Sequence, residues 1–518
     1  MNLQSFYSLL ALLLPAAILQ AETKPNVVII VADDLGYADL SFLPQSPKDV
    51  RTPALDQLAG DGTYFSNAYA TSPICSPSRT GLITGRYQQR WGNYWYGQGG
   101  LPNEEVTLPQ VLGKLGYAST KIGKTHLNGG PAEHPLDHGF DDFLGFIHHT
   151  WDYIRLSERD LAAYRKRAAG ESLGILNVGP LERGRGESAS YDDGFTTEIF
   201  TDEAINIIEA GKTSETPFYI QLEYNAVHMP TYVADPDYAR KAGYEQPAWN
   251  READKWEFPF WDPREISWNQ WHKKWGHLGE VDPLGRKRYL ANLMALDDSV
   301  GRIIKALDET GQRNDTIVVF MSDNGGTINT YANNTPLRGY KYMFGEGGVR
   351  IPIIVSWPGH LPQGETRHVL VSGMDVFPTV VQLAGGESPD NLDGQSLVPI
   401  LNDKVDVASP GPQICGHDYL CFSDGKQTWS IRQGDWKLIS SPGWMHLNYR
   451  LDEDNIAHRA EDEIYPQGLI LFNLKDDVGE TTDLSSSHPE RVKNMTALYD
   501  AWRAEMGKPV SGKVKQPR

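Results

Sequence analysis

Residues 27–34 read Val-Val-Ile-Ile-Val-Ala-Asp-Asp. Five β-branched residues in succession predict a strand, and the lack of polar alternation predicts that both of its faces are buried. Strands of this kind belong to parallel sheets that helices cover on both sides. Two aspartates follow the strand directly, at the carboxyl end where ligands bind in open α/β sheets. The stretch therefore predicts both a sheet and the edge of that sheet where a site would lie.

The segments that follow alternate between the same two patterns. Further strands are expected at 117–122, 218–224, 316–321 and 351–357, and helices at 52–60, 108–115, 195–210, 288–307 and 374–383. This alternation indicates an α/β fold with a large, mainly parallel sheet and helices on both faces.

Both ends of the chain differ from this pattern. The apolar run that ends at Gln20-Ala21 is typical of a signal peptide. After about residue 400, short strands and a closing helix predict a smaller α+β unit. We expect a signal peptide at 1–21, a catalytic domain at 22–400 and a C-terminal subdomain at 401–518.

Composition narrows the function classes. Lys and Arg number 48 against 67 Asp and Glu, a formal net charge of −19, which argues against nucleic acid as a partner. No apolar run after residue 21 is long enough to span a bilayer, so we expect an exported protein, periplasmic or secreted, without a stable membrane anchor. Cys415 and Cys421 are close enough in sequence to pair in an oxidising compartment, which leaves Cys75 alone.

Polar residues follow each of four expected strands. They are Asp33 and Asp34, Lys124 and His126, Asn225 and His228, and Asp323 and Asn324. The carboxylate and amide oxygens among them suit Ca²⁺ or Mg²⁺ better than zinc. Ordinary turn and capping chemistry is the alternative for each pair taken alone, because Asp-Asp and Asp-Asn-Gly are common in turns.

The most specific feature is Cys75-Ser76-Pro77-Ser78-Arg79, followed by Thr84-Gly85-Arg86. Pro77 fits the first turn of a helix, which would place Cys75 at the helix N-terminus. Free amides there favour an anion, and Arg79 adds a positive charge one turn on. From these residues alone, Cys75 reads as a thiolate nucleophile.

At these residues the chain resembles the formylglycine-dependent (type I) sulfatases of the alkaline phosphatase superfamily, such as N-acetylgalactosamine-6-sulfatase and bacterial polysaccharide sulfatases. The matching motifs are Cys75-x-Pro77-Ser78-Arg79, Gly123-Lys124-Thr125-His126, Asp33-Asp34, Asp323-Asn324-Gly325 and Arg338-Gly339-Tyr340-Lys341. Thr125 departs from the tryptophan usual in the second motif. The resemblance implies an alkaline-phosphatase-like fold and removal of sulfate from a sulfated oligosaccharide or polysaccharide.

The resemblance also implies a role for each residue. Cys75 would be oxidised to Cα-formylglycine by a formylglycine-generating maturation enzyme, and its hydrate would attack sulfur. The implied calcium ligands are Asp33, Asp34, residue 75, Asp323 and Asn324. Arg79 would orient the hydrate and the carboxylates, and Lys124 and Lys341 would bind sulfate oxygens. His126 would be the base that frees sulfate, and His228 the acid that protonates the leaving alcohol, with Lys341 as a second donor. His126 lies two residues after Lys124, so in an extended segment both side chains would point to the same face.

Two further stretches are candidates for substrate contact. His148 and His149 lie where the family often places a polar group toward the sulfate or sugar. A tryptophan-rich stretch at 249–275 either walls a sugar subsite or is a packed surface insertion.

Two other functions stay open at this stage. One is a phosphomonoesterase or phosphonate hydrolase of the same superfamily, for which manganese or zinc would be the expected metal. The other is a glycan-binding protein without activity. Binding alone needs no nucleophile, so the complete set of Cys75, Arg79, the two lysines and the two histidines argues against this second alternative.

Overall fold

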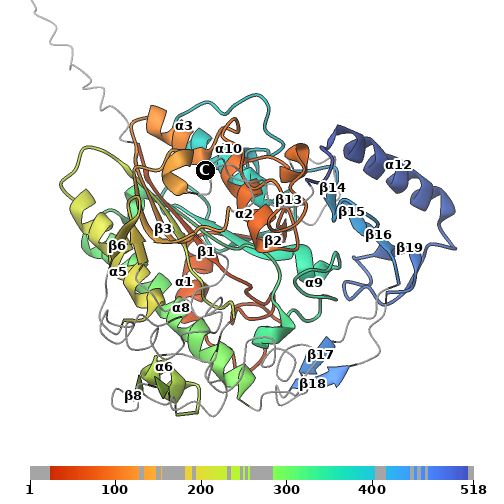
Figure 1. Cartoon of the computed structure of the whole chain (residues 1–518), viewed down its shortest axis with the longest axis horizontal. Helices are drawn as coiled ribbons and strands as arrows, with labels where there is room; N and C mark the ends of the chain where they lie inside the picture. The colour runs from red at the N-terminus through yellow and green to blue at the C-terminus, as the bar shows by residue number, and fades with distance from the viewer. Residues whose placement is uncertain are drawn as a thin grey trace, which may run out of the picture.

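The computed structural model describes residues 24–127, 134–147, 153, 181–189, 194–229, 231, 235–245, 249–250, 255–256, 284–402, 416–443, 448–451, 457–460 and 465–510. A large mixed sheet forms its centre (Figure 1). Its strands in spatial order are β12 (Glu365–Arg367), β2 (Thr63–Tyr69), β11 (Arg350–Ser356), β10 (Thr316–Ser322), β1 (Asn26–Ala32), β7 (Phe218–Glu223), β3 (Ala118–Lys124), β4 (Asp142–Phe146), β5 (Leu181–Arg183) and β6 (Glu187–Ala189), with β13 (Val371–Ser372) beside β2.

The middle of this sheet is parallel, as the sequence predicts. Val28 in β1 pairs with Val318 in β10 on one side and with Ile220 in β7 on the other. β3 and β4 continue the parallel arrangement beyond β7. The carboxyl ends of β1, β10, β7 and β3 therefore meet at one edge of the sheet.

The sheet departs from the parallel pattern toward its edges. β11 runs antiparallel to β10, and β2 runs antiparallel to β11. β2 is also a strand that the sequence pattern did not indicate. Its residues mix polar and aromatic types without a clear period, yet all but Asn67 are buried.

Helices cover both faces of the sheet, also as predicted (Figure 1). Val28, Ile30 and Ala32 pack with α1 (Pro53–Gly60), α5 (Thr196–Gly211) and α8 (Gly285–Glu309). Val27, Ile29 and Val31 pack on the other face with α2 (Cys75–Thr84), α3 (Leu108–Lys114) and α10 (Val376–Leu383). Successive residues of a strand point to opposite faces, so one continuous apolar run serves both layers. The remaining described helices are α6 (Pro236–Lys241), α9 (Glu346–Val349), α11 (Val398–Asn402) and α12 (Pro489–Glu505).

A small antiparallel sheet follows in the C-terminal part. It consists of β14 (Leu420–Ser423), β15 (Trp429–Gln433), β16 (Trp436–Ser441) and β19 (Gly468–Asn473), with α12 packed against β15 and β16. Two short strand pairs, β17 (Asn448–Leu451) with β18 (Ala457–Ala460) and β8 (Trp249–Asn250) with β9 (Lys255–Trp256), complete the described strands.

A buried ionic network joins this small sheet to the large one. Glu346 in α9 accepts from Lys437 in β16 at 2.8 Å and from Tyr69 in β2 at 2.6 Å. Arg432 in β15 also reaches Glu346, at 3.2 Å. A buried charge is tolerated only when it is paired in this way. The network fixes α9, and with it the loop that carries Lys341.

Some sequence expectations bear on residues that the structure leaves undescribed. Cys421 lies buried in β14 as a free cysteine, and Cys415 lies outside the described residues. The signal peptide at 1–21 and most of the tryptophan-rich stretch also lie outside them. Within the described part of the chain, no helix is long and apolar enough to cross a membrane.

Candidate active site

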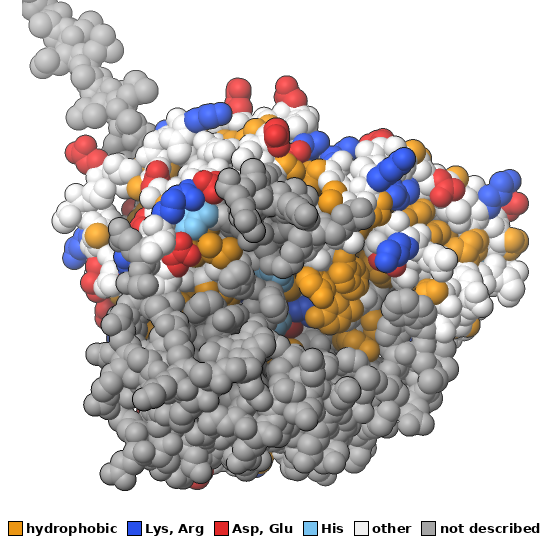
Figure 2. Space-filling model, viewed as in Figure 1, with side chains coloured by type: hydrophobic (Ala, Val, Ile, Leu, Met, Phe, Trp, Pro, Cys, Tyr) orange, Lys and Arg blue, Asp and Glu red, His pale blue; other side chains and the backbone are white. Residues whose placement is uncertain are grey.

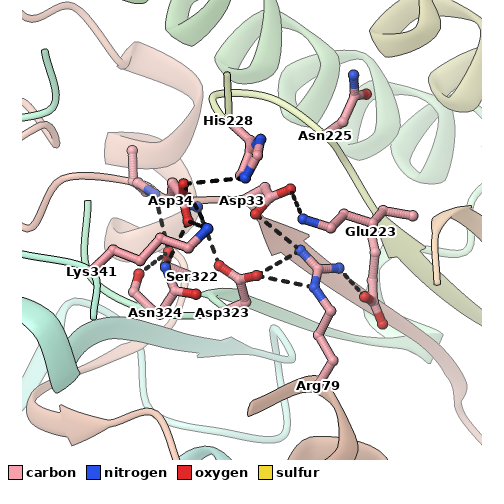
Figure 3. Close-up of polar contacts among 12 residues, drawn as sticks. Asp33, Asp34, Arg79, Glu223, Asn225, His228, Ser322, Asp323, Asn324 and Lys341 are labelled. Carbon is pink, nitrogen blue, oxygen red and sulfur yellow. Dashed lines mark hydrogen bonds and ion pairs between the residues drawn. The ribbon is translucent and has the colours of Figure 1, made fainter. Parts of the chain in front are cut away.

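Four oxygen-bearing side chains meet just beyond β1 and β10 (Figure 3). Asp33 and Asp34 follow β1, and Asp323 and Asn324 follow the parallel neighbour β10. The two pairs contact each other, because the backbone amide of Asp34 donates to Asp323 Oδ1 at 3.2 Å and Asn324 Nδ2 donates to Asp34 Oδ1 at 2.7 Å. All four are buried. The structure thus brings together residues that lie about 290 positions apart in the chain.

Arg79 is the positive centre of this cluster. It extends from the second turn of α2, and its Nε and Nη2 donate to Asp323 Oδ2 at 3.0 and 2.8 Å. It also pairs with Glu223 at the end of β7 and lies 3.5 Å from Asp33 Oδ1. Burial opposes the charge, but Asp323, Glu223 and Asp33 together raise the pKa of Arg79 well above its usual value. Arg79 therefore stays charged and holds three carboxylates in place.

Two lysines and a histidine approach the aspartate pair. Lys124, the last residue of β3, pairs with Asp33, and Lys341 Nζ lies 2.7 Å from Asp34 Oδ1. His228 Nε2 lies 3.6 Å from Asp34 Oδ2, while its Nδ1 donates to the Met229 carbonyl at 2.5 Å. Figure 3 shows His228 and Lys341 both directed at Asp34.

The electrostatics of these groups differ. Burial and the nearby Lys341 hold the pKa of His228 well below its usual range, so the ring is neutral. Burial would also lower the pKa of Lys341, but Asp34 beside it raises that pKa well above its usual value. Lys341 is thus a charged donor, whereas His228 presents an unprotonated Nε2 to the site.

Cys75 is the first residue of α2, as the sequence predicts from Pro77. The residue before it is extended, and the chain turns into the helix at Cys75 itself. Its side chain is buried, and burial raises the pKa of the thiol although Lys124 and Lys341 lie near enough to lower it in part. An unmodified Cys75 is therefore a neutral thiol at neutral pH. That argues against the plain thiolate nucleophile that the residues alone suggest.

The oxygen cluster fits a hard divalent cation. Asn324 Oδ1 is buried and has no hydrogen-bond partner among the described residues, and Asp33 Oδ1 has only the long ion pair to Arg79 at 3.5 Å. Such oxygens are rare in folded proteins unless a donor or a cation meets them. One oxygen each of Asp33 and Asp34 and a ring nitrogen of His228 also lie within 4.8 Å of one another. Carboxylate and amide oxygens in this number match calcium or magnesium.

The backbone at His126 differs from the sequence expectation, and two other predicted histidines lie outside the described residues. His126 was expected on an extended segment with Lys124, both side chains on one face. Its backbone instead adopts φ of 50°, and its amide donates to the Ile147 carbonyl at 3.0 Å, so the strand has already ended. The argument from strand alternation is wrong for this residue, although it remains buried two positions after Lys124. His148 and His149 lie outside the described residues.

Glu223 and Lys121 belong to the site but were missed from the sequence. Glu223 ends β7, and Lys121 in β3 pairs with it. Burial lowers the pKa of Lys121 to about 8 against the opposing charge of Glu223. Lys121 and Arg79 in turn lower the pKa of Glu223, which burial alone would raise. A charged residue inside an expected buried strand was the available signal, because such a residue needs a partner.

Comparisons with known proteins agree with this geometry. The family model described as Sulfatase matches residues 25–386, and that described as N-sulphoglucosamine sulphohydrolase, C-terminal, matches residues 339–455. Mouse (Mus musculus) N-acetylgalactosamine-6-sulfatase is 31% identical over 401 residues, covering 74% of this chain and 67% of that protein. The human (Homo sapiens) protein of the same name is 31% identical over 505 residues, covering 92% of this chain and 85% of its own.

A solved structure, Ps i-CgsB in complex with k-i-k-neocarrahexaose, superposes with a TM-score of 0.72 at 29% identity and covers 94% of each chain. The Sulfatase model spans β1 through α10 and so includes every strand end that carries a site residue. The family model and the two relatives therefore cover the large sheet and the strand ends that form the site. The chain belongs to the sulfatase family and is a sulfuric ester hydrolase.

Proposed function

We propose that this sulfatase removes sulfate from a sulfated carbohydrate, with Cys75 converted to formylglycine and with calcium bound by Asp33, Asp34, residue 75, Asp323 and Asn324. The observation that carries the proposal is the meeting of Cys75, two lysines and the oxygen cluster at one buried edge of the sheet. The names of the relatives support the substrate class, since they describe a sugar sulfatase and a carbohydrate complex.

The charges of the site support a cation as well as an anionic substrate. Among the described residues around Arg79, four buried acids meet four buried bases: Asp33, Asp34, Glu223 and Asp323 against Arg79, Lys121, Lys124 and Lys341. This set is balanced before a sulfate ester enters. Burying one more negative charge is costly unless a positive charge accompanies it. A divalent ion supplies that charge and polarises the ester.

The chain's own residues would divide the remaining work. Lys124 at the end of β3 and Lys341 in the loop before α9 would hold the sulfate oxygens as point charges. Arg79 would hold the carboxylates and residue 75 in position relative to one another. Once oxidised to an aldehyde and hydrated, residue 75 would supply one hydroxyl to attack sulfur and a second to expel sulfate. His126 would take the proton in that second half. The leaving alcohol would receive its proton from the charged Lys341 or from His228, which is neutral in the free site and would take up a proton as the anionic ester binds beside it.

The test of the function is release of inorganic sulfate from a panel of sulfated oligosaccharides by protein co-expressed with a formylglycine-generating enzyme. Aryl phosphates and phosphonate esters, assayed with calcium, manganese and zinc, form the second arm. Sulfate release that depends on calcium would support the proposal. Faster release of phosphate or phosphonate with manganese or zinc would replace it with the phosphatase alternative.

The two histidines should affect different halves of the reaction. His126→Ala should release about one equivalent of alcohol per active site and then stall, because only the step that frees sulfate needs its base. His228→Ala should instead slow alcohol release from a sugar sulfate by about 10²–10⁴-fold. The loss should be smaller with nitrophenyl sulfate, since that leaving group needs little protonation.

Rapid-quench kinetics with both substrates separates these outcomes. A burst from the His228 variant and none from the His126 variant would reverse the two assignments. It would leave the sulfatase function intact, because either order still requires both histidines.

A further inference from the structure

A cavity of about 720 Å³ opens next to the candidate active site. Its lining comes from three places: Trp95 and Gln98, the segment Tyr342–Gly345 before α9, and residues of the C-terminal sheet and its hairpin. Its size falls in the range of about 300–1,000 Å³ that is usual for small-molecule sites. None of the residues assigned a catalytic or metal-binding role above lines it.

Tyr342 connects this cavity to the active site. The Tyr342 amide donates to the Pro73 carbonyl at 2.8 Å, two residues before Cys75, and its ring centroid lies 5.6 Å from Lys341 Nζ. The cavity thus begins about one side chain away from the lysine proposed to hold sulfate.

The wall next to Lys341 is an aromatic platform. Trp95 and Tyr342 contact each other with ring centroids 6.0 Å apart at an interplanar angle of 35°. Tyr342 is 45% exposed and Tyr96, the neighbour of Trp95, is 57% exposed. These are two of the three large apolar side chains that are exposed in the described residues. Figure 2 shows an apolar patch over the α9 region, next to a small group of charged and histidine side chains.

Polar residues also line the cavity. Asp424, Lys426, Gln427 and Thr428 come from the hairpin between β14 and β15. One acid and one base leave that hairpin without net charge. Gln98 adds a side-chain amide to the lining. A ligand for this cavity would therefore have one apolar face and several hydroxyl groups, and it would not need a charge.

We propose that this cavity is a subsite for further, unsulfated sugar units of the same chain that presents its sulfate to Lys124 and Lys341. A sugar ring offers an apolar C–H face to an aromatic ring and hydroxyl groups to amides and hydroxyls. The inference rests on the proposed function and deepens it. The preferred substrate is an oligosaccharide or polysaccharide, and a sulfated monosaccharide is a poor one because it leaves the aromatic platform empty.

The test compares kcat/KM for a sulfated monosaccharide, a sulfated tetrasaccharide with the same sulfated unit, and nitrophenyl sulfate. The wild type should prefer the tetrasaccharide to the monosaccharide by at least about tenfold, the factor that one buried ring face provides. Trp95→Ala should remove most of that preference and change nitrophenyl sulfate turnover by less than about twofold. Trp357→Ala is the matched control, because Trp357 packs on His360 and does not line the cavity. It should change neither the preference for the tetrasaccharide nor the turnover of nitrophenyl sulfate.

The kcat/KM values of the wild type for the monosaccharide and the tetrasaccharide test the subsite even if the Trp95 variant does not fold. Equal kcat/KM for the two sugar substrates would overturn the subsite, as would a Trp95→Ala variant that loses both activities equally. Failure of the wild type to cleave even nitrophenyl sulfate would overturn the proposed function itself, and the subsite with it. The two failures are therefore distinguishable.

Discussion

Cys75→Ala is expected to lower sulfate ester turnover at least about 10³-fold, because loss of a nucleophile leaves only binding and electrostatic contributions. Cys75 starts α2 with its side chain buried among the site residues, and the substitution adds no bulk there. The midpoint of thermal unfolding should therefore change little. Turnover and thermal unfolding, measured on one preparation, check both statements.

Ser76→Ala is the matched control for this variant. Ser76 is the next residue of the same helical turn, is equally buried, and its hydroxyl has no hydrogen-bond partner among the described residues. We expect it to keep activity within a few-fold of the wild type. A Cys75→Ala enzyme with activity comparable to that of the Ser76 variant would exclude residue 75 as the nucleophile.

Asp323→Asn should remove calcium binding and activity together. The carboxylate receives two bonds from Arg79 and one from the Asp34 amide, and it carries one of the negative charges that would face the ion. Asparagine keeps the size of the aspartate side chain and one of its oxygens but carries no charge. We expect calcium affinity and turnover to fall by at least about a hundredfold. Arg79 keeps Glu223 and Asp33 as partners, so the loss of stability should stay below the roughly 3–5 kcal/mol that a fully unpaired buried charge costs.

Calcium binding can be measured independently of activity by thermal unfolding. An ion that binds only the folded state raises the unfolding temperature as its concentration rises. The wild type should show that rise, and Asp323→Asn should not. Asp315→Asn, an exposed position just before the other end of the same strand, should behave as the wild type does. A chelator-treated wild type with full activity and no calcium-dependent rise would show that the metal assignment is wrong.

The parts of the site that could be predicted from local sequence are those at the ends of buried strands. Asp33, Asp34, Asp323 and Asn324 each follow a continuous apolar run, and a parallel sheet must bring such ends together. Pro77 likewise indicated the start of α2 at Cys75. His228 also follows an expected strand, but its role was assigned from the family resemblance. Lys341 was assigned from the family motifs, at a position that periodicity alone would not single out.

Other features depend on contacts that a local pattern does not contain. β2 mixes Thr, Ser and Asn with aromatic residues, and it is a buried strand because β11, β12 and β13 pair with it. The direction of β11 was likewise not determined by its apolar run. Glu223 and Lys121 are tolerated in buried strands only because they face each other and Arg79. The left-handed backbone at His126 ended an extended segment that the Lys124-x-His126 spacing suggested.

The central claim concerns the chemical state of residue 75, and one measurement tests it most directly. The peptide that contains Cys75 is weighed by mass spectrometry in preparations with graded co-expression of a formylglycine-generating enzyme, and sulfate ester turnover is measured on the same samples. We predict turnover proportional to the fraction of peptide that shows the thiol-to-aldehyde mass loss, falling to near zero where that fraction is zero. Full turnover from protein that carries only unmodified Cys75 would contradict the claim.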